Sequence, residues 1–267
     1  MKYKLRVSSS VIGFREKAER IWKLERYKFP QDIFKPVVFF GLYHWVDYLR
    51  FIIHRGKKTI AWCGSDILNL NKFLTKLFQA KHYCENEVER DKLRSVGISA
   101  EIRPTFLEDV NDFPITYKQS RRPQVFISTR EGREKEYGVN LIYKIAGGLP
   151  HIVFHIYGLS WWTSEMPIRK NVILHGLVSE KQFNEEIKNY QAGLRLNEFD
   201  GFSEVLAKSI LSGQYPISRI KYPMIDNYET EEELVALLKD LKNKIEPNYK
   251  AREFWKNYVN KLEFLLD

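Results

Sequence analysis

Short apolar segments alternate with helical patterns along almost the whole chain, and this alternation limits the fold more than any other feature. In the first half, four predicted strands are separated by helical patterns: 37–40, 57–63, 81–84 and 100–104. After residue 119 the alternation resumes with five more strands: 124–129, 151–158, 171–176, 192–197 and 215–218. Strands that alternate with helices form parallel sheets with crossover helices. The sequence therefore predicts an α/β protein.

A polar stretch divides the chain into two parts. Residues 105–122 contain Pro114 and the cluster "KQSRRP", which is typical of a linker. A length of 267 residues also favours two domains. We expect one domain over 1–118 and another over 119–248, followed by a final helix in 249–267 that packs back onto the first domain.

Composition excludes several classes of protein. Hydrophobic residues make up 44% of the chain, which is too many for a disordered protein. No long uncharged apolar run is present, so the sequence predicts neither a membrane span nor a signal peptide. Cys63 and Cys84 form no metal-binding pattern, and a disulfide scaffold is not expected. These features favour a cytoplasmic protein.

Positive charge is concentrated in the first half. Residues 1–118 contain 22 Lys and Arg against 14 Asp and Glu, whereas residues 119–267 contain 21 against 20. We interpret 11–28 as a basic amphipathic helix that could dock on anionic lipid or an acidic glycan, at the inner membrane face. The alternative is a solvated helix face that only keeps the protein in solution. Nucleic acid is not an expected partner, because no recognisable binding module is present.

An acidic loop precedes a predicted helix in the second domain. In "NEFDGFSEVLAKSIL", 197–211, Glu198, Asp200 and Gly201 follow a strand, and a helix begins near Ser203. Free backbone N–H groups at a helix start bind anions, while carboxylates accept hydrogen bonds from hydroxyl groups. A nucleotide sugar offers both kinds of group. The alternative is that Asp200 only caps the helix.

A basic turn follows the first strand of the same domain. "STREGREKEYG", 128–138, places Arg130 and Lys135 close together in sequence, with Arg133 between them. A guanidinium and an ammonium group can stabilise the charge that develops on a departing diphosphate. The alternative is an ordinary solvated turn. Together with the acidic loop, this turn favours a nucleotide-sugar site in 119–248.

These two motifs resemble those of the GT-B glycosyltransferases, in the large retaining group that uses nucleotide-sugar donors. "TREGREKEYG" is similar to the family's Arg-x-x-x-x-Lys-Gly element, and "EFDGFSEVLAKSILSGQYPI" is similar to its acidic loop. Asp200 matches the first acid of that loop and Gly213 matches its glycine. Lys208 stands where the family has a second acid that commonly holds the donor ribose. A lysine cannot accept those hydrogen bonds.

The first half resembles the acceptor domain of the same family in a shortened form. "VVFFGLYHW" and "KKTIAWCGSDI" are similar to two strand-loop pieces of that domain, and the glycine-rich loop that usually opens it has no counterpart here. The resemblance implies two Rossmann-like domains with a cleft between them, the first domain being reduced. It also implies that His44, Ser65 and Asp66 face the acceptor.

The resemblance further implies roles for the second domain. Arg130 and Lys135 would stabilise the diphosphate, and Asp200 would act with them at the reacting sugar. The remaining donor-binding residues would be Glu198, Gly201, Phe202, Ser203, Glu204, Gly158, Leu177 and Val178. The predicted reaction moves a hexosyl unit to a glycan or lipid-linked acceptor with retained configuration, and it needs no metal or cofactor. The alternative is a non-catalytic relative that binds a nucleotide or sugar.

Overall fold

The computed structural model describes residues 3–68, 70, 79–161 and 168–259. The chain divides into two compact units: the first contains Met1–Asp109, Phe199–Phe202 and Asn257–Asp267, and the second contains Val110–Glu198 and Ser203–Lys256. The polar linker had indicated a boundary after residue 118, but the chain enters the second unit at Val110. Tyr117 accounts for this difference, because it is buried and its backbone N–H donates to the Ser212 carbonyl of the second unit.

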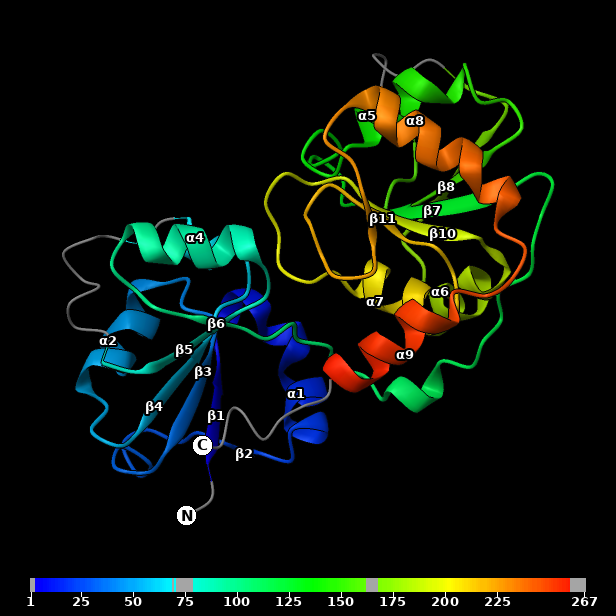
Figure 1. The fold of residues 1–267 in the computed structure, drawn as a ribbon. Coiled ribbons are helices and arrows are strands. Elements are labelled where there is room, and N and C mark those ends of the chain that lie inside the picture. Colours follow the sequence, from blue (N-terminus) through cyan, green and yellow to red (C-terminus); the bar gives the residue numbers. More distant parts are fainter. Residues whose placement is uncertain (1–2, 69, 71–78, 162–167, 260–267) are drawn as a thin grey trace. The chain divides into compact units, whose positions relative to one another are not determined.

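The first unit contains a six-stranded sheet in which every neighbouring pair is parallel, in the order β2-β1-β3-β4-β5-β6 (Figure 1). The strands are β1 Lys4–Val7, β2 Glu25–Arg26, β3 Val37–Phe40, β4 Lys58–Ala61, β5 Lys81–Cys84 and β6 Glu101–Ile102. Its described helices are η1 Ser9–Phe14, α1 Arg15–Ile21, α2 Trp45–Ile53, η2 Ser65–Ile67 and α4 Glu87–Ser95. The helical pattern between the predicted strands 57–63 and 81–84 lies mostly outside the described residues.

The motif "VVFF" shows why this sheet is apolar on both faces. Val38 and Phe40 pack on one side with Trp22, which follows α1. Val37 and Phe39 pack on the other side with Phe51 of α2. A parallel strand that is covered on both faces has no polar side, so it appears in the sequence as a continuous apolar run.

The predicted helix over 11–28 is wrong in its length. The α-helix ends at Ile21, and the chain then forms β2, which pairs with β1. The Tyr27 backbone N–H continues this pairing by donating to the Leu5 carbonyl at 2.8 Å. Both residues of β2 are charged and exposed, as is common for an edge strand, so no apolar pattern marked it in the sequence.

The second unit also contains a parallel six-stranded sheet, in the order β12-β11-β10-β7-β8-β9. The strands are β7 Gln124–Ser128, β8 Val153–Tyr157, β9 Val172–Gly176, β10 Ala192–Arg195, β11 Ile217–Ser218 and β12 Asp226–Asn227. The α-helices are α5 Val139–Ala146, α6 Glu180–Glu186, α7 Glu204–Leu211, α8 Glu231–Asp240 and α9 Tyr249–Tyr258. Short 3-10 turns complete the unit: η3 Val110–Asp112, η4 Ile187–Asn189 and η5 Leu241–Asn243.

Helices cover both faces of this second sheet (Figure 1). Residues of α5 and α8 share one apolar cluster with Val125, Ile127 and Phe154. On the other face, Phe126 packs in a cluster with Val205 of α7 and with residues of α6 and η4. The final helix, expected in 249–267, is described as α9 over Tyr249–Tyr258, and residues 260–267 lie outside the described residues. Its residues up to Lys256 belong to the second unit and not, as expected, to the first.

Each sheet has one point where the strand order changes direction. In the first unit this switch point lies between β1 and β3, and in the second it lies between β7 and β10. In open α/β sheets, ligands bind beside the carboxyl ends of the strands at such a point. The loops that follow these four strands are therefore the places to look for function.

Candidate functional site

The loops after β7 and β10 pack against each other at the switch point of the second unit. Gly138 has a φ of +75°, and a Cβ atom at this position would lie 2.5 Å from the Leu196 Cβ. Beside it, the Arg195 guanidinium lies 4.5 Å from the centre of the Tyr137 ring. The end of the basic turn therefore lies against the residues that lead into the acidic loop.

Arg130 and Lys135 present positive charge at this switch point. Both side chains are exposed, and neither makes an ion pair or a side-chain hydrogen bond within the described residues. Arg133, between them, differs, because its guanidinium pairs with Glu136 at 3.2 Å. The turn thus carries two cations that no acid of the described chain neutralises, which favours binding of an anion.

The start of α7 is capped by Ser203. Its hydroxyl oxygen accepts the Val205 backbone N–H at 3.2 Å. The alternative in which Asp200 caps this helix is therefore excluded. The Asp200 carboxylate accepts the Gly201 backbone N–H instead. Glu198 is 77% exposed and pairs with Arg219 at 3.0 Å, so its carboxylate is at the surface beside the loop.

Three of the residues expected to bind the donor, Gly158, Leu177 and Val178, differ in exposure. Gly158 is required by close packing, because a Cβ atom there would lie 2.1 Å from the Thr129 carbonyl oxygen. Leu177 is 93% exposed and is open to a ligand. Val178 is partly buried and packs against the cluster of Phe126 and Tyr157, so its main contacts are internal.

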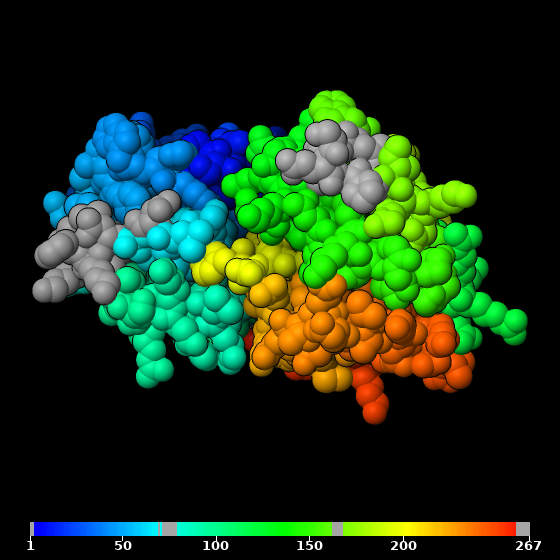
Figure 2. All heavy atoms as spheres, turned by 90° about the horizontal axis from the view of Figure 1, so that it is seen from above, coloured from blue at the N-terminus to red at the C-terminus, as the bar shows by residue number. Residues whose placement is uncertain are grey.

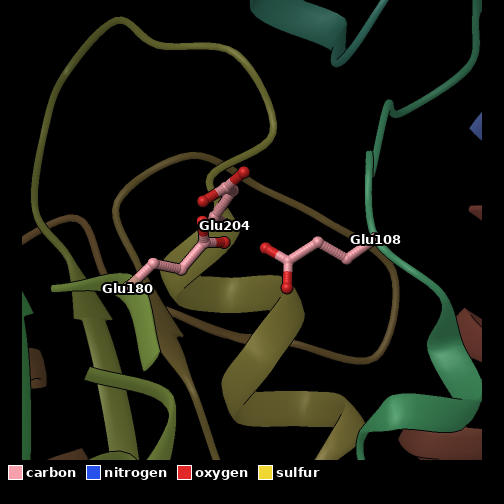
Figure 3. A group of neighbouring side chains, drawn as sticks. All are labelled: Glu108, Glu180 and Glu204. Atoms are coloured by element: carbon pink, nitrogen blue, oxygen red, sulfur yellow. The ribbon is translucent and has the colours of Figure 1, made fainter. Parts of the chain in front are cut away.

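Lys208 is buried at the position where the resembling family has an acid. Its ammonium nitrogen lies 3.5 Å from a Glu180 carboxylate oxygen and 3.6 Å from a Glu204 carboxylate oxygen. Those two carboxylates lie within 4.8 Å of one another. Figure 3 shows the side chains of Glu180 and Glu204 side by side. Glu108, also drawn there, belongs to the first unit and pairs with Lys17 at 3.3 Å. The Lys208 charge is thus used to hold two like charges together on α6 and α7.

The part of the acidic loop over 199–202 belongs to the first unit. The Phe202 backbone N–H donates to a Glu85 carboxylate oxygen at 2.8 Å, and the Asn86 side-chain amide donates to the Asp200 carbonyl at 2.7 Å. A Cβ atom on Gly201 would lie 2.0 Å from the same Glu85 oxygen. In Figure 2, yellow atoms of this loop lie against cyan atoms of the first unit. Of the donor-binding amides expected from the sequence, that of Phe202 is already bound to a carboxylate.

Glu85 and Glu89 form a buried carboxyl pair below this loop. The second Glu85 oxygen accepts the Thr105 N–H, and one Glu89 oxygen accepts the Glu85 N–H at 2.7 Å. The other Glu89 oxygen is buried with no hydrogen-bond partner among the described residues. Burial raises the pKa of both carboxyl groups. The sequence did not reveal this pair, because acids around the N-cap Asn86 are also what an ordinary helix start shows.

At the switch point of the first unit, Asp47 organises the loop that carries His44. Its carboxylate accepts hydrogen bonds from the Ser8 hydroxyl at 2.6 Å and from the Arg6 guanidinium at 2.9 Å, and also from the His44 backbone N–H. The exposed His44 ring has its Nε2 atom 2.8 Å from the Ser10 hydroxyl oxygen. His44 is therefore held at the carboxyl edge of this sheet, and Ser10 is a neighbour that the sequence did not suggest.

Asp66 is buried rather than presented to a ligand. Its two carboxylate oxygens accept the Leu42 N–H at 3.1 Å and the Cys63 N–H at 3.0 Å. Burial raises the pKa of this carboxyl to about 7. In this structure Asp66 joins the loops after β3 and β4, while the adjacent Ser65 is exposed.

Comparison with known proteins supports the fold. No protein-family model and no curated protein sequence matches the chain. Among solved structures, TarM matches with a TM-score of 0.65 and 14% identity over 88% of this chain, which spans 54% of TarM. WaaB, a lipopolysaccharide outer core galactosyltransferase, matches with a TM-score of 0.62 and 18% identity, and the match covers 95% of this chain and 79% of WaaB. Anabaena HepE matches with a TM-score of 0.63 and 10% identity, and the match covers 99% of this chain and 97% of HepE.

These neighbours are GT-B glycosyltransferases, so the chain has the GT-B fold of two Rossmann-like domains. This confirms the fold class expected from the sequence. The chain spans about half the length of TarM. In the part of the chain that the structure describes, no helix has the length and apolar character needed to cross a membrane.

Proposed function

We propose that the protein is a glycosyltransferase that moves a hexosyl unit from a nucleoside-diphosphate sugar to a glycan or lipid-linked acceptor. The observation that carries this proposal is the pair of exposed, unneutralised cations Arg130 and Lys135, at the switch point of the second unit. A diphosphate is the ligand whose charge they suit, and the adjoining loop of Glu198 offers acceptors for sugar hydroxyl groups.

The structural neighbours support a nucleotide-sugar donor. TarM has been solved with UDP and α-GlcNAc-glycerol, and HepE has been solved with UDP and glucose. Those ligands belong to those proteins. For this chain they favour a nucleoside diphosphate as the first ligand to test.

In the proposed reaction, Arg130 and Lys135 stabilise the charge on the diphosphate as the glycosidic bond breaks. Ser203 and Glu204, at the start of α7, contribute the positive end of the helix dipole. Asp200 binds hydroxyl groups of the sugar. Because the chain supplies these cations itself, we propose transfer without a metal ion. We propose retained configuration at the sugar from the resemblance to the retaining family.

The first unit would offer the acceptor. His44 stands at its switch point beside Ser10, and Ser65 is exposed on the loop after β4. We also propose a cytoplasmic protein that is peripheral at the inner membrane face, where a lipid-linked acceptor would be within reach.

The test begins with a thermal-shift screen of the whole chain against nucleoside diphosphates and their sugars, because a ligand of the native state raises the melting temperature. With a donor identified, Arg130→Ala should lower the transfer rate by roughly 10²–10³-fold. Arg133→Ala is the matched control, since Arg133 lies in the same turn but is paired with Glu136. Equal rates for wild type and Arg130→Ala would refute the proposed role.

Lys208 favours a second candidate function, a relative that binds a nucleotide or sugar without turnover. Its ion pairs with Glu180 and Glu204 occupy the position where the resembling family places a ribose-binding acid. Calorimetry that detects nucleoside-diphosphate binding, together with no product from any donor or acceptor tried, would support this candidate over the enzyme.

A further inference from the structure

The surface formed by residues 28–58 exposes large apolar side chains. Along α2, one stripe points to solvent instead of the core: Trp45, Val46, Leu49 and Ile52. Trp45 is 73% exposed, although a tryptophan is usually buried for most of its surface. Phe29 and Phe34, in the turn before β3, are also exposed, and Phe34 is 76% exposed. Exposed apolar surface of this extent on one segment indicates an interaction site.

The turn that carries the two phenylalanines is attached to the C-terminal end of α2. The backbone N–H groups of Arg55 and Gly56 donate to the Ile33 carbonyl at 2.9 and 3.1 Å. The Arg50 guanidinium also lies 3.6 Å from the centre of the Phe29 ring. The stripe and the turn therefore belong to one continuous region, which we call the α2 surface.

Charged side chains of this segment are sorted by sign. The acids, Asp32 and Asp47, are each only 3% exposed. Asp32 is neutralised by Lys35 at 2.8 Å, and Asp47 is neutralised by Arg6. The exposed charged side chains of 28–58 are all basic: Lys28, Lys35, Arg55 and Lys57. The α2 surface thus combines exposed aromatic and aliphatic groups with positive charge and no exposed acid.

The basic segment expected to dock on a membrane exposes two large apolar side chains, Ile12 and Phe14 of η1, but α1 itself exposes none. Ala18 of α1 and Trp22 just after it are buried in the core of the first unit. Ile21 is partly buried and packs against the same cluster. The outer side of α1 therefore offers charge without apolar groups, whereas α2 offers both.

We propose that the α2 surface docks the protein on an anionic lipid surface. The exposed Trp45, Leu49 and Ile52 side chains would enter the boundary between headgroups and acyl chains, while the basic side chains contact lipid phosphates. Charge complementarity selects this partner, because a surface with six exposed apolar groups and only basic charges matches an anionic interface. The inference specifies the peripheral location proposed above and does not depend on sugar transfer.

The test measures binding of the whole chain to vesicles by co-flotation, without any sugar donor. Vesicles of phosphatidylcholine with phosphatidylglycerol should bind the wild type, and vesicles of phosphatidylcholine alone should bind it much less. A Trp45→Ser, Leu49→Ser double variant should reduce binding at least about tenfold, because it removes the two central apolar groups. Leu177→Ser is the matched control: Leu177 is 93% exposed but belongs to the second unit.

A charge variant measures how much electrostatic attraction contributes to vesicle binding, apart from the apolar groups. Arg55→Gln should weaken binding by about fivefold and reduce its dependence on salt, given about 1 kcal/mol for each basic residue near an anionic membrane. Arg121→Gln, at an exposed residue of the second unit, should bind like the wild type. All substituted side chains are exposed, so the variants should melt at the same temperature as the wild type. This measurement would show that the variants are folded.

Three results would overturn the proposal. The first is a wild type that does not bind anionic vesicles, and the second is equal binding by the double variant and the Leu177 control. The third is a wild type that forms dimers in solution through Trp45 and Leu49 and keeps these dimers when vesicles are added. That result would mean that the α2 surface binds a second copy of the chain and not lipid. Each result leaves the nucleotide-binding screen unaffected, so failure here is distinct from failure of the proposed activity.

Discussion

The Glu85 carboxylate accepts the Phe202 backbone N–H at 2.8 Å, although the two residues are 117 positions apart. This contact places the acidic loop over 199–202 in the first unit, while Glu198 and Ser203 on either side belong to the second. The glycine in the loop follows from the same contact, because a side chain at residue 201 would collide with the carboxylate. Gly201 is therefore needed for packing, whatever ligand the loop binds.

Gly201→Ala should destabilise the protein. The added Cβ atom would lie 2.0 Å from a Glu85 oxygen, so the loop must move away and the Phe202 hydrogen bond must lengthen. We expect a loss of about 1–3 kcal/mol in urea unfolding, together with faster hydrogen exchange at the Phe202 amide. Gly13→Ala is the control, because a Cβ atom there would meet no atom within 4 Å. A loss no larger than that of the control would contradict this account.

The buried Glu89 carboxyl should make stability fall as pH rises. Burial raises its pKa in the folded state, so the folded protein binds a proton that the unfolded chain releases near pH 4.5. Between these two pKa values the native state holds more protons, and the free energy of unfolding decreases with increasing pH. Glu89→Gln keeps the shape but cannot ionise, so its unfolding curves at pH 5 to 8 should vary less with pH than those of the wild type. Identical pH dependence would count against this prediction.

The buried His155 should make the free energy of unfolding decrease as the pH falls, which is the opposite of the effect of Glu89. Its Nδ1 atom lies 2.8 Å from His175 Nε2, its Nε2 atom lies 2.9 Å from the Gln124 side-chain oxygen, and burial lowers its pKa to about 4. The unfolded chain binds a proton near pH 6.5, so stability decreases as pH falls from 6.5 toward 4. His155→Gln should remove up to about 3 kcal/mol of this pH dependence. Thermal unfolding of both proteins across that range is the measurement.

Restoring the family's acid by Lys208→Glu should not restore a ribose site. It would place a third carboxylate, itself buried, beside Glu180 and Glu204, so we expect a lower melting temperature and no gain in nucleotide binding. Lys208→Met fills a similar volume and leaves two carboxylates that are 49% and 35% exposed, so its stability should be close to that of the wild type. A Lys208→Glu protein that is stable and binds nucleotide more tightly would reverse this interpretation.

Much of the fold could be predicted because some of its central strands are continuous apolar runs. Val37–Phe40 and Gln124–Ser128 are strands as expected, and the helix start at Ser203 follows from its capping hydroxyl. Three strands were missed: Lys4–Val7, Glu25–Arg26 and Asp226–Asn227. The first is short and alternates basic with apolar residues, and the other two are edge strands of two polar residues with no apolar pattern. Such short strands can be recognised only in the folded sheet, from their pairing with the neighbouring strands.

The candidate site was predictable only in part, for a related reason. Arg130 and Lys135 could be named as candidates because a basic turn after a strand is a local pattern. Glu85 was not found, because its role depends on a backbone N–H far along the chain, and no local pattern reports such a partner. Asp66 shows the same limit, since the sequence cannot distinguish a carboxylate that meets a ligand from one that ties two loops together.

The loop over 199–202 also constrains how the protein can be made. A nascent chain that has just left the ribosome through residue 109 already contains Thr105, one partner of the Glu85 carboxylate, but it lacks the other partner, Phe202, which is 117 residues after Glu85. At typical rates of synthesis this interval is on the order of 10 s. Throughout it, a buried acid of the early-emerging half remains open to water, so that half completes its assembly only when most of the other half has been translated.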